Sequence, residues 1–132
     1  MSLSPIQADP EKWARALYAD AVDQKDAAGF AAVFAEDGTL QFGNQPPIAG
    51  RQKIEEAITQ FFLVMVELHH DFTAISRDGS RWFLEANVTY TRHDRTVVTV
   101  PAMTVFQMSE CNGKPVAQSC RIYVDLTPLF AT

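Results

Sequence analysis

The sequence predicts an α+β fold in which helices come first and a long antiparallel sheet follows. In the first half of the chain, apolar residues recur every three or four positions, which is the period of an amphipathic helix. From residue 70 onward the period changes to two, as in strands that bury one face. Asn112-Gly113 lies between two strand-like runs and is a strong hairpin signal. Together these observations predict helices packed on an antiparallel meander.

Two short helices are expected at the start of the chain. Asp9-Pro10-Glu11 combines an N-cap, a proline at the first helical position and an acid in the first turn, so a helix should run from here to about Gln24. Asp26 is the expected N-cap of a second helix. Asp37-Gly38 then turns the chain into a short strand over residues 39–42. The apolar stripe of the first helix is Trp13, Ala16, Leu17 and Ala21.

A third helix should begin near Arg51 and run to about Leu68, because apolar residues keep the helical spacing over this whole segment. Its second half is apolar on all sides, so it must be covered on more than one side. We therefore expect a bent sheet that wraps around this helix. The residues expected in the interior are Phe61, Val88 and Val105.

Four strands complete the predicted meander. The first begins at His70, the second alternates over residues 82–91, the third covers 95–108 with Pro101 at a bulge or an edge, and the last covers 116–126. No repeat, linker or low-complexity segment interrupts this order. We expect a single domain over residues 1–132.

Composition argues against several classes of function. A net charge of -5 and the lack of a basic cluster disfavour nucleic acid and membrane surfaces as partners. The longest apolar run is too short to span a bilayer, and no signal peptide is recognisable. Cys111 and Cys120 are expected to be reduced thiols in a cytoplasmic protein. No metal-ligand spacing and no phosphate-binding glycine loop occurs, so we expect no metal and no cofactor.

Four longer segments resemble a known superfamily. ALYADAVDQKDAAGFAAVFAEDGTLQF and GRQKIEEAITQFF resemble the opening helices and the Gly-Arg-x-x-Ile helix of nuclear transport factor two-like families. VTYTRHDRTVVTVPAMTVFQM and CRIYVDLTPLF are similar to the strands of the SnoaL-like branch, which includes polyketide cyclases. The resemblance covers nearly the whole chain and implies a cone-shaped, cystatin-like sheet around a pocket for a small apolar molecule. It does not fix the reaction, because this fold hosts isomerases, cyclases, hydrolases, dehydratases and binding domains.

Two chemistries of the superfamily fit this sequence poorly. Aligned with ketosteroid isomerase, the essential tyrosine falls on Tyr18, but the base falls on Phe42 and the second acid on Met103, so two of three groups are missing. Aligned with limonene epoxide hydrolase, one acid matches Asp125. Its Arg-x-Asp motif falls near Asn87-Val88-Thr89, where the charged pair is absent.

The SnoaL-like resemblance implies one acid/base group near the end of the chain. Asp125 would fill this role in an apolar interior, with His70 as its partner and Tyr90 or Tyr18 as a hydrogen-bond donor. The alternatives are that Asp125 pairs with an arginine, that His70 only closes the mouth of the cone, and that both tyrosines are core residues. The residues expected to line the pocket are Trp13, Phe42, Phe61, Met65, Trp82, Val88, Met103, Val105, Arg121 and Tyr123.

Three functions remain open at this stage. The first is a cofactor-independent isomerase, cyclase or hydrolase acting on an apolar molecule, cyclic molecules included. The second is a module that binds a small lipophilic ligand without catalysis, and the third is a dimeric accessory domain. We expect a homodimer through the outer face of the long strands, where Thr89, Thr91, Val98 and Phe106 would leave a partly apolar surface.

Overall fold

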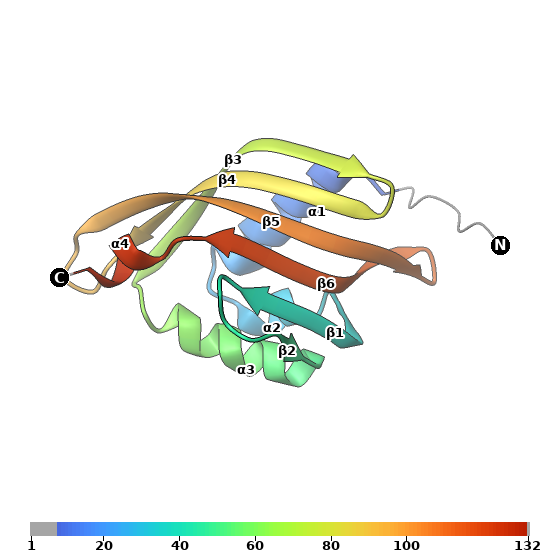
Figure 1. Ribbon diagram of the computed structural model, residues 1–132, viewed down its shortest axis with the longest axis horizontal. Helices are drawn as coiled ribbons and strands as arrows, with labels where there is room; N and C mark the ends of the chain where they lie inside the picture. Colours follow the sequence, from blue (N-terminus) through green and yellow to red (C-terminus); the bar gives the residue numbers. More distant parts are fainter. Residues whose placement is uncertain (1–7, 132) are drawn as a thin grey trace.

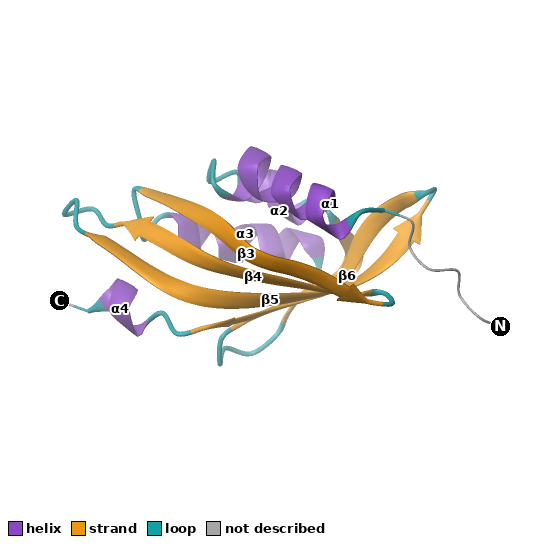
Figure 2. Cartoon of the chain, turned by 90° about the horizontal axis from the view of Figure 1, so that it is seen from above, coloured by secondary structure: helices purple, strands orange, loops and turns teal. Residues whose placement is uncertain are grey.

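The computed structural model describes residues 8–131, so residues 1–7 and 132 of the predicted domain lie outside the described part. Six strands form one curved sheet, and α1, α2 and α3 lie on the same side of this sheet (Figures 1 and 2). The predicted α+β cone is confirmed. The strands are β1 (Phe34–Phe42), β2 (Ile48–Ala49), β3 (Glu67–Asp78), β4 (Arg81–Thr91), β5 (Val97–Cys111) and β6 (Lys114–Val124). The helices are α1 (Pro10–Leu17), η1 (Tyr18–Val22), α2 (Ala27–Ala31), α3 (Arg51–Phe62) and α4 (Thr127–Phe130).

Both predicted N-caps at the start of the chain are present. The Asp9 carboxylate accepts a hydrogen bond from the backbone N–H of Glu11 at 3.0 Å, and that of Asp26 accepts one from Gly29 at 3.0 Å. Each cap satisfies a backbone donor that the first turn of the helix leaves free.

Within residues 8–131 no helix is both long and apolar enough to cross a membrane.

The first helix changes from α to π geometry before it ends. The backbone N–H of Asp23 donates to the carbonyl of Tyr18 at 2.8 Å, a bond that spans five residues instead of four. In an α-helix, residues five apart point about 140° away from each other. The wider turn brings Tyr18 and Asp23 closer to the same side, which determines what the end of this helix can contact.

The third helix is shorter than expected. It ends at Phe62, the chain turns through residues 63–66, and β3 begins at Glu67 instead of His70. Met65 is fully buried although it lies in this turn, so the apolar run fills the core without being helical. The carbonyls of Met65 and Val66 accept hydrogen bonds from Nζ of Lys25, at 2.9 and 3.2 Å, which replaces helical partners.

The meander from β3 to β6 is confirmed. Asn112 and Gly113 both have positive φ, 55° and 79°, as the two-residue hairpin requires. The strand order is β2-β1-β6-β5-β4-β3. β1 pairs in parallel with β6 and starts at Phe34, earlier than expected, and the short β2 was not predicted.

The residues of β5 that point inward are shifted by one position from those predicted. Thr104 and Phe106 are buried against the helices, whereas Val105 is half-buried on the outer face. The expectation that Val105 is interior and that Phe106 and Val98 point outward is therefore wrong. β5 carries apolar residues on both faces, so its alternation could not indicate the buried one. Val88 is buried as predicted, and Phe61 is half-buried.

Candidate functional site

A cavity lies between the helices and the concave face of the sheet. The space not filled by atoms in the cavity and at its mouth is about 500 Å³. Most of the wall is aliphatic or aromatic, as in pockets for small molecules. The lining residues are Tyr18, Val22, Phe30, Phe42, Ile58, Phe61, Phe62, Leu68, His70, Val88, Tyr90, Ala102, Thr104, Ile122 and Val124.

Four polar side chains interrupt this apolar wall, and each comes from a different element. Tyr18 lies on η1, His70 on β3, Tyr90 on β4 and Thr104 on β5. The sheet places the three strand residues on one face. His70 pairs with Val88 of β4, and Thr104 pairs with Leu84 of the same strand. Val88 and Leu84 lie on the same face of β4 as Tyr90, because alternate residues of a strand share a face. Polar groups from distant parts of the sequence therefore converge on one apolar space.

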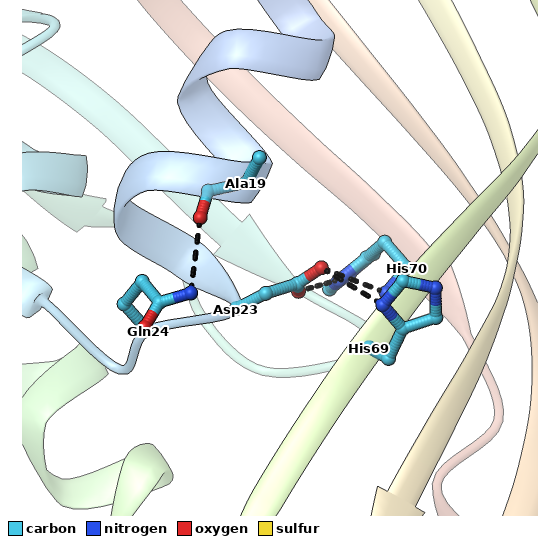
Figure 3. A network of polar contacts seen from close by, with 5 residues as sticks. All are labelled: Ala19, Asp23, Gln24, His69 and His70. Carbon is cyan, nitrogen blue, oxygen red and sulfur yellow. Dashed lines mark hydrogen bonds and ion pairs between the residues drawn. The ribbon is translucent and has the colours of Figure 1, made fainter.

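His70 is held in position by Asp23, which follows η1 (Figure 3). Nδ1 of His70 lies 2.7 Å from Oδ1 of Asp23, and the backbone N–H of His70 donates to Oδ2 at 3.0 Å. The two side chains are only 13% and 12% exposed. Because a carboxylate accepts hydrogen bonds, Nδ1 is the protonated nitrogen and Nε2 is left free to accept a proton.

The neighbouring His69 has a different environment. Its side chain is 74% exposed, and its Nδ1 is 3.6 Å from Oδ2 of Asp23. Successive residues of a strand face opposite ways, so only one of the two histidines can reach the cavity. His70 is the one that lines it.

Tyr18 and Tyr90 are both buried phenols. The Tyr18 ring packs edge-on against His70, with 4.6 Å between ring centroids. Burial raises the pKa of Tyr18 and of Tyr90 well above the ordinary tyrosine value. Both side chains are consequently neutral hydroxyls at ordinary pH and can act as hydrogen-bond donors.

These raised pKa values predict a loss of stability in alkaline solution. Above pH ~10 the unfolded chain releases its tyrosine protons, while the folded state keeps those of Tyr18 and Tyr90, so stability falls as pH rises. The expected slope is about 1.4 kcal/mol per pH unit for each residue. Urea unfolding at a series of pH values would measure it. If the two tyrosines ionise in the native state with ordinary pKa values, no such slope will appear, and tyrosinate absorbance will reveal the early ionisation.

Asp125 lies outside the cavity. It is exposed at the end of β6, where Oδ1 accepts a hydrogen bond from the backbone N–H of Thr127 at 2.9 Å, at the start of α4. Hydrogen bonds from the Thr127 side chain and backbone hold the pKa of Asp125 below its usual value. The expectation that Asp125 sits in an apolar interior is wrong. Without burial there is no reason to expect a carboxyl pKa raised toward the range that suits proton exchange.

The other predicted pocket residues fall into three groups. Phe42, Phe61 and Val88 line the cavity as expected. Met65 is fully buried in the core. Trp13 and Trp82 pack edge to face, 5.4 Å between centroids, in the core beside the cavity. The residues that instead lie on the outer face of the sheet are Met103, Val105, Arg121 and Tyr123.

A bulge explains why the face of β6 was predicted wrongly. Gln107 pairs with Ser119 and Met108 with Ala117, so Gln118 is an extra residue on β6. The bulge changes which alternate residues point inward. Beyond it Ile122 and Val124 line the cavity, and the guanidinium of Arg121 instead packs over the Tyr123 ring and donates to Gln41 on the outside.

Two residues of the site were not predicted from the sequence. Asp23 reaches His70 only because of the π-turn, and the spacing of an ordinary helix would direct it elsewhere. Thr104 is buried, and an isolated threonine in a β-branched strand gives no sequence signal. Among the described residues, no group of three or more His, Cys, Asp or Glu side chains is placed to hold a metal ion.

Solved structures with this architecture come from several bacteria. A protein with a ketosteroid isomerase-like fold from Catenulispora acidiphila DSM 44928, in complex with trimethylamine, has a TM-score of 0.74 at 20% identity, over 94% of this chain and 92% of that one. ActVI-ORFA from Streptomyces coelicolor has a TM-score of 0.73 at 18% identity, over 87% and 93%.

A further similar structure is an NTF2-like protein of unknown function from Burkholderia pseudomallei K96243. Its TM-score is 0.77 at 14% identity, over 95% of this chain and 100% of that one. At these identities the similarity shows the fold alone. No curated protein sequence matches the chain at a significant level.

The family is shown by sequence. The SnoaL-like domain family matches residues 14–117, which include η1, α3 and most of the meander. This range contains Tyr18, Asp23, His70, Tyr90 and Thr104, so the whole polar part of the cavity falls within the family domain. The chain therefore belongs to the SnoaL-like domain family.

Proposed function

We propose that the protein is an enzyme that moves a proton within a small, largely apolar molecule held in the cavity, with His70 as the general acid/base. The observation that carries this proposal is the 2.7 Å hydrogen bond from Nδ1 of His70 to Asp23 at the wall of an apolar cavity. Such a bond fixes the tautomer and the orientation of the ring.

The proposed step is proton removal from a carbon next to a carbonyl group. Nε2 of His70 takes the proton, the electron pair of the C–H bond moves toward the carbonyl, and the developing charge on oxygen accepts a hydrogen bond from Tyr18 or Tyr90. The proton then returns to another atom of the same molecule. Isomerisation, ring closure and dehydration can all begin in this way.

The walls of the cavity support a class of substrate. No Lys or Arg lines the cavity within the described residues, so nothing there would neutralise a carboxylate or phosphate. Aromatic residues form much of the wall. An uncharged molecule of one or two rings that carries a carbonyl or hydroxyl group fits these properties.

The test is deuterium exchange from solvent. The protein is incubated in D₂O with cyclohexanone and a panel of one- and two-ring ketones, and exchange next to the carbonyl is followed by NMR. Exchange faster than in buffer with at least one ketone supports the proposal. Binding of these ketones without any accelerated exchange would instead support a binding protein.

Ligand binding without catalysis is the second candidate function, because the wall of the cavity is mostly apolar. The similar structure from Catenulispora acidiphila holds trimethylamine, a small molecule with an apolar surface. Aromatic walls also attract alkylammonium groups.

A cytoplasmic location is part of both proposals and is supported by two free thiols, Cys111 and Cys120.

We also propose a homodimer through the outer face of the sheet. Tyr123 is 51% exposed there and lies beside Met103, which pairs with it, while Val105 and Phe83 form the neighbouring pair. Light scattering is expected to give twice the 14.7 kDa chain mass. Val105→Lys should yield the monomer, because it buries a charge in the interface.

The control for the dimer is Leu63→Lys, a similar change at an exposed residue of the turn after α3. It should leave the dimer intact. A monomeric mass for the unmodified protein at micromolar concentration would contradict the proposal.

A further inference from the structure

We infer that a hollow beside α4 is a second binding subsite, which takes the apolar tail of a ligand whose carbonyl end lies in the cavity. This outer hollow is lined by residues 42–45 at the end of β1 and by residues 124–127, 130 and 131 around α4. The inference deepens the proposed function, on which it rests for the ligand in the cavity.

The outer hollow adjoins the cavity. Phe42 and Val124 line both of them. On the cavity side, the Phe42 ring packs against Phe61, with 4.9 Å between ring centroids. A ligand too long for the cavity would therefore extend past Phe42 and Val124 into the outer hollow.

The sheet brings the two walls of the outer hollow together. β1 and β6 are neighbouring parallel strands, and Phe42 at the end of β1 pairs with Ile122 near the end of β6. Parallel strands end at the same edge of a sheet, so the segments that follow them meet there. The segment after β1 is the turn at residues 43–45, and the segment after β6 leads into α4 (Figure 1).

Both walls are held in place without a ligand. Nε2 of Gln41 donates to the carbonyl of Gln45 at 3.2 Å, which closes the turn after β1. On the other wall, Leu129 is buried in the core and the guanidinium of Arg92 donates to the carbonyl of Pro128. A preformed hollow costs little ordering when a ligand binds.

The side chains of the outer hollow favour an uncharged tail. Phe130 is 58% exposed there, an unusual position for a large aromatic ring, and Leu126 adds a second apolar group that the cavity does not share. No Lys or Arg of the described residues lines the outer hollow, whereas the exposed carboxylate of Asp125 does. An aromatic or alkyl tail fits these walls, and a carboxylate or phosphate on the tail would be repelled.

The experiment compares cyclohexanone with 4-phenylcyclohexanone, whose phenyl group is attached opposite the carbonyl. Dissociation constants are measured by NMR titration of the full chain. The longer ketone should bind about tenfold more tightly, the gain expected when roughly 60 Å² of apolar surface is buried. Amide signals of residues 43–45 and of Phe130 should shift with the longer ketone and stay in place with cyclohexanone.

Phe130 is the residue to change, because its ring lies in the outer hollow and is not part of the cavity wall. Phe130→Ala should reduce the preference for the longer ketone to about twofold and leave the affinity for cyclohexanone unchanged. Phe130→Leu, which keeps an apolar side chain, should retain more of the preference than Phe130→Ala. The control is Leu63→Ala, at an apolar residue that is 63% exposed and lines neither the cavity nor the outer hollow, and it should have no effect.

The inference is overturned if the two ketones bind equally, if Phe130→Ala keeps the preference, if Leu63→Ala removes it to the same extent, or if neither ketone binds. Deuterium exchange into cyclohexanone without a preference for the longer ketone would reject the subsite and leave the proposed catalysis standing. A preference that depends on Phe130, without any exchange, would reject the catalysis and leave the subsite standing.

Discussion

Replacing His70 with glutamine is expected to slow proton transfer by about two to four powers of ten. Glutamine keeps an amide that can donate and accept hydrogen bonds, but it cannot take up a proton. The loss should appear as slower deuterium exchange into any ketone that the unmodified protein accepts. Ketone binding should change much less, because most of the cavity wall is apolar and remains intact.

The control for this substitution is the residue next to it. His69→Gln makes the same chemical change at a side chain that is 74% exposed on the opposite face of β3. The exchange rate of this variant should stay within about twofold of that of the unmodified protein, since exposed ion pairs contribute little. Asp23→Asn should fall between the two, because the ring keeps its proton acceptor but loses the carboxylate that orients it. Equal rates for His70→Gln and the unmodified protein would rule out His70 as the acid/base.

Replacing Phe106 with alanine is expected to reduce the free energy of unfolding by about 3–5 kcal/mol. The ring is fully buried and packs edge-on against Trp13, with centroids 5.1 Å apart. Its removal would leave a cavity at a point where β5, β4 and α1 meet. Urea unfolding followed by circular dichroism measures the change, which is a large part of the stability of a domain of this size.

Phe83 provides the control, because the same substitution there falls on the outer face of the neighbouring strand. It is half-exposed and lies under the guanidinium of Arg81 at 5.4 Å. Phe83→Ala should cost less than about 1 kcal/mol. Unfolding at several protein concentrations separates this cost from any dissociation of a dimer. A larger cost at Phe83 than at Phe106 would mean that the inward face of the sheet has been assigned wrongly.

Local rules predicted much of this fold. The two aspartate caps, the Asn112-Gly113 turn and the alternation in β4 depend on neighbours in the sequence, and all three are present. The length of the third helix was wrong, because an apolar run is equally suited to a buried turn. The hydrogen bonds that favour the turn come from Lys25, which is 40 residues away from Met65.

The site was predictable only where the face of an element was unambiguous. Tyr90 lies on a strand with clear alternation and His70 on its neighbour, so both were placed correctly in the cavity. Asp125 was misplaced because one extra residue at Gln118 reverses the faces of β6, and a bulge leaves no mark in the pattern of residue types. Asp23 was missed because its direction depends on a change of helix type.

The π-turn at Tyr18–Val22 also makes this helix tolerant of a change in its length. Relative to an α-helical path it contains one residue too many, so deleting one residue between Tyr18 and Asp23 would give a regular helix. Tyr18 and Asp23 would then be four residues apart, about 40° around the helix axis, and would still lie on the same side. The carboxylate that orients His70 would keep its direction. In a set of aligned relatives, a one-residue gap here is therefore compatible with the same pair of side chains, whereas an α-helical turn without the gap is not.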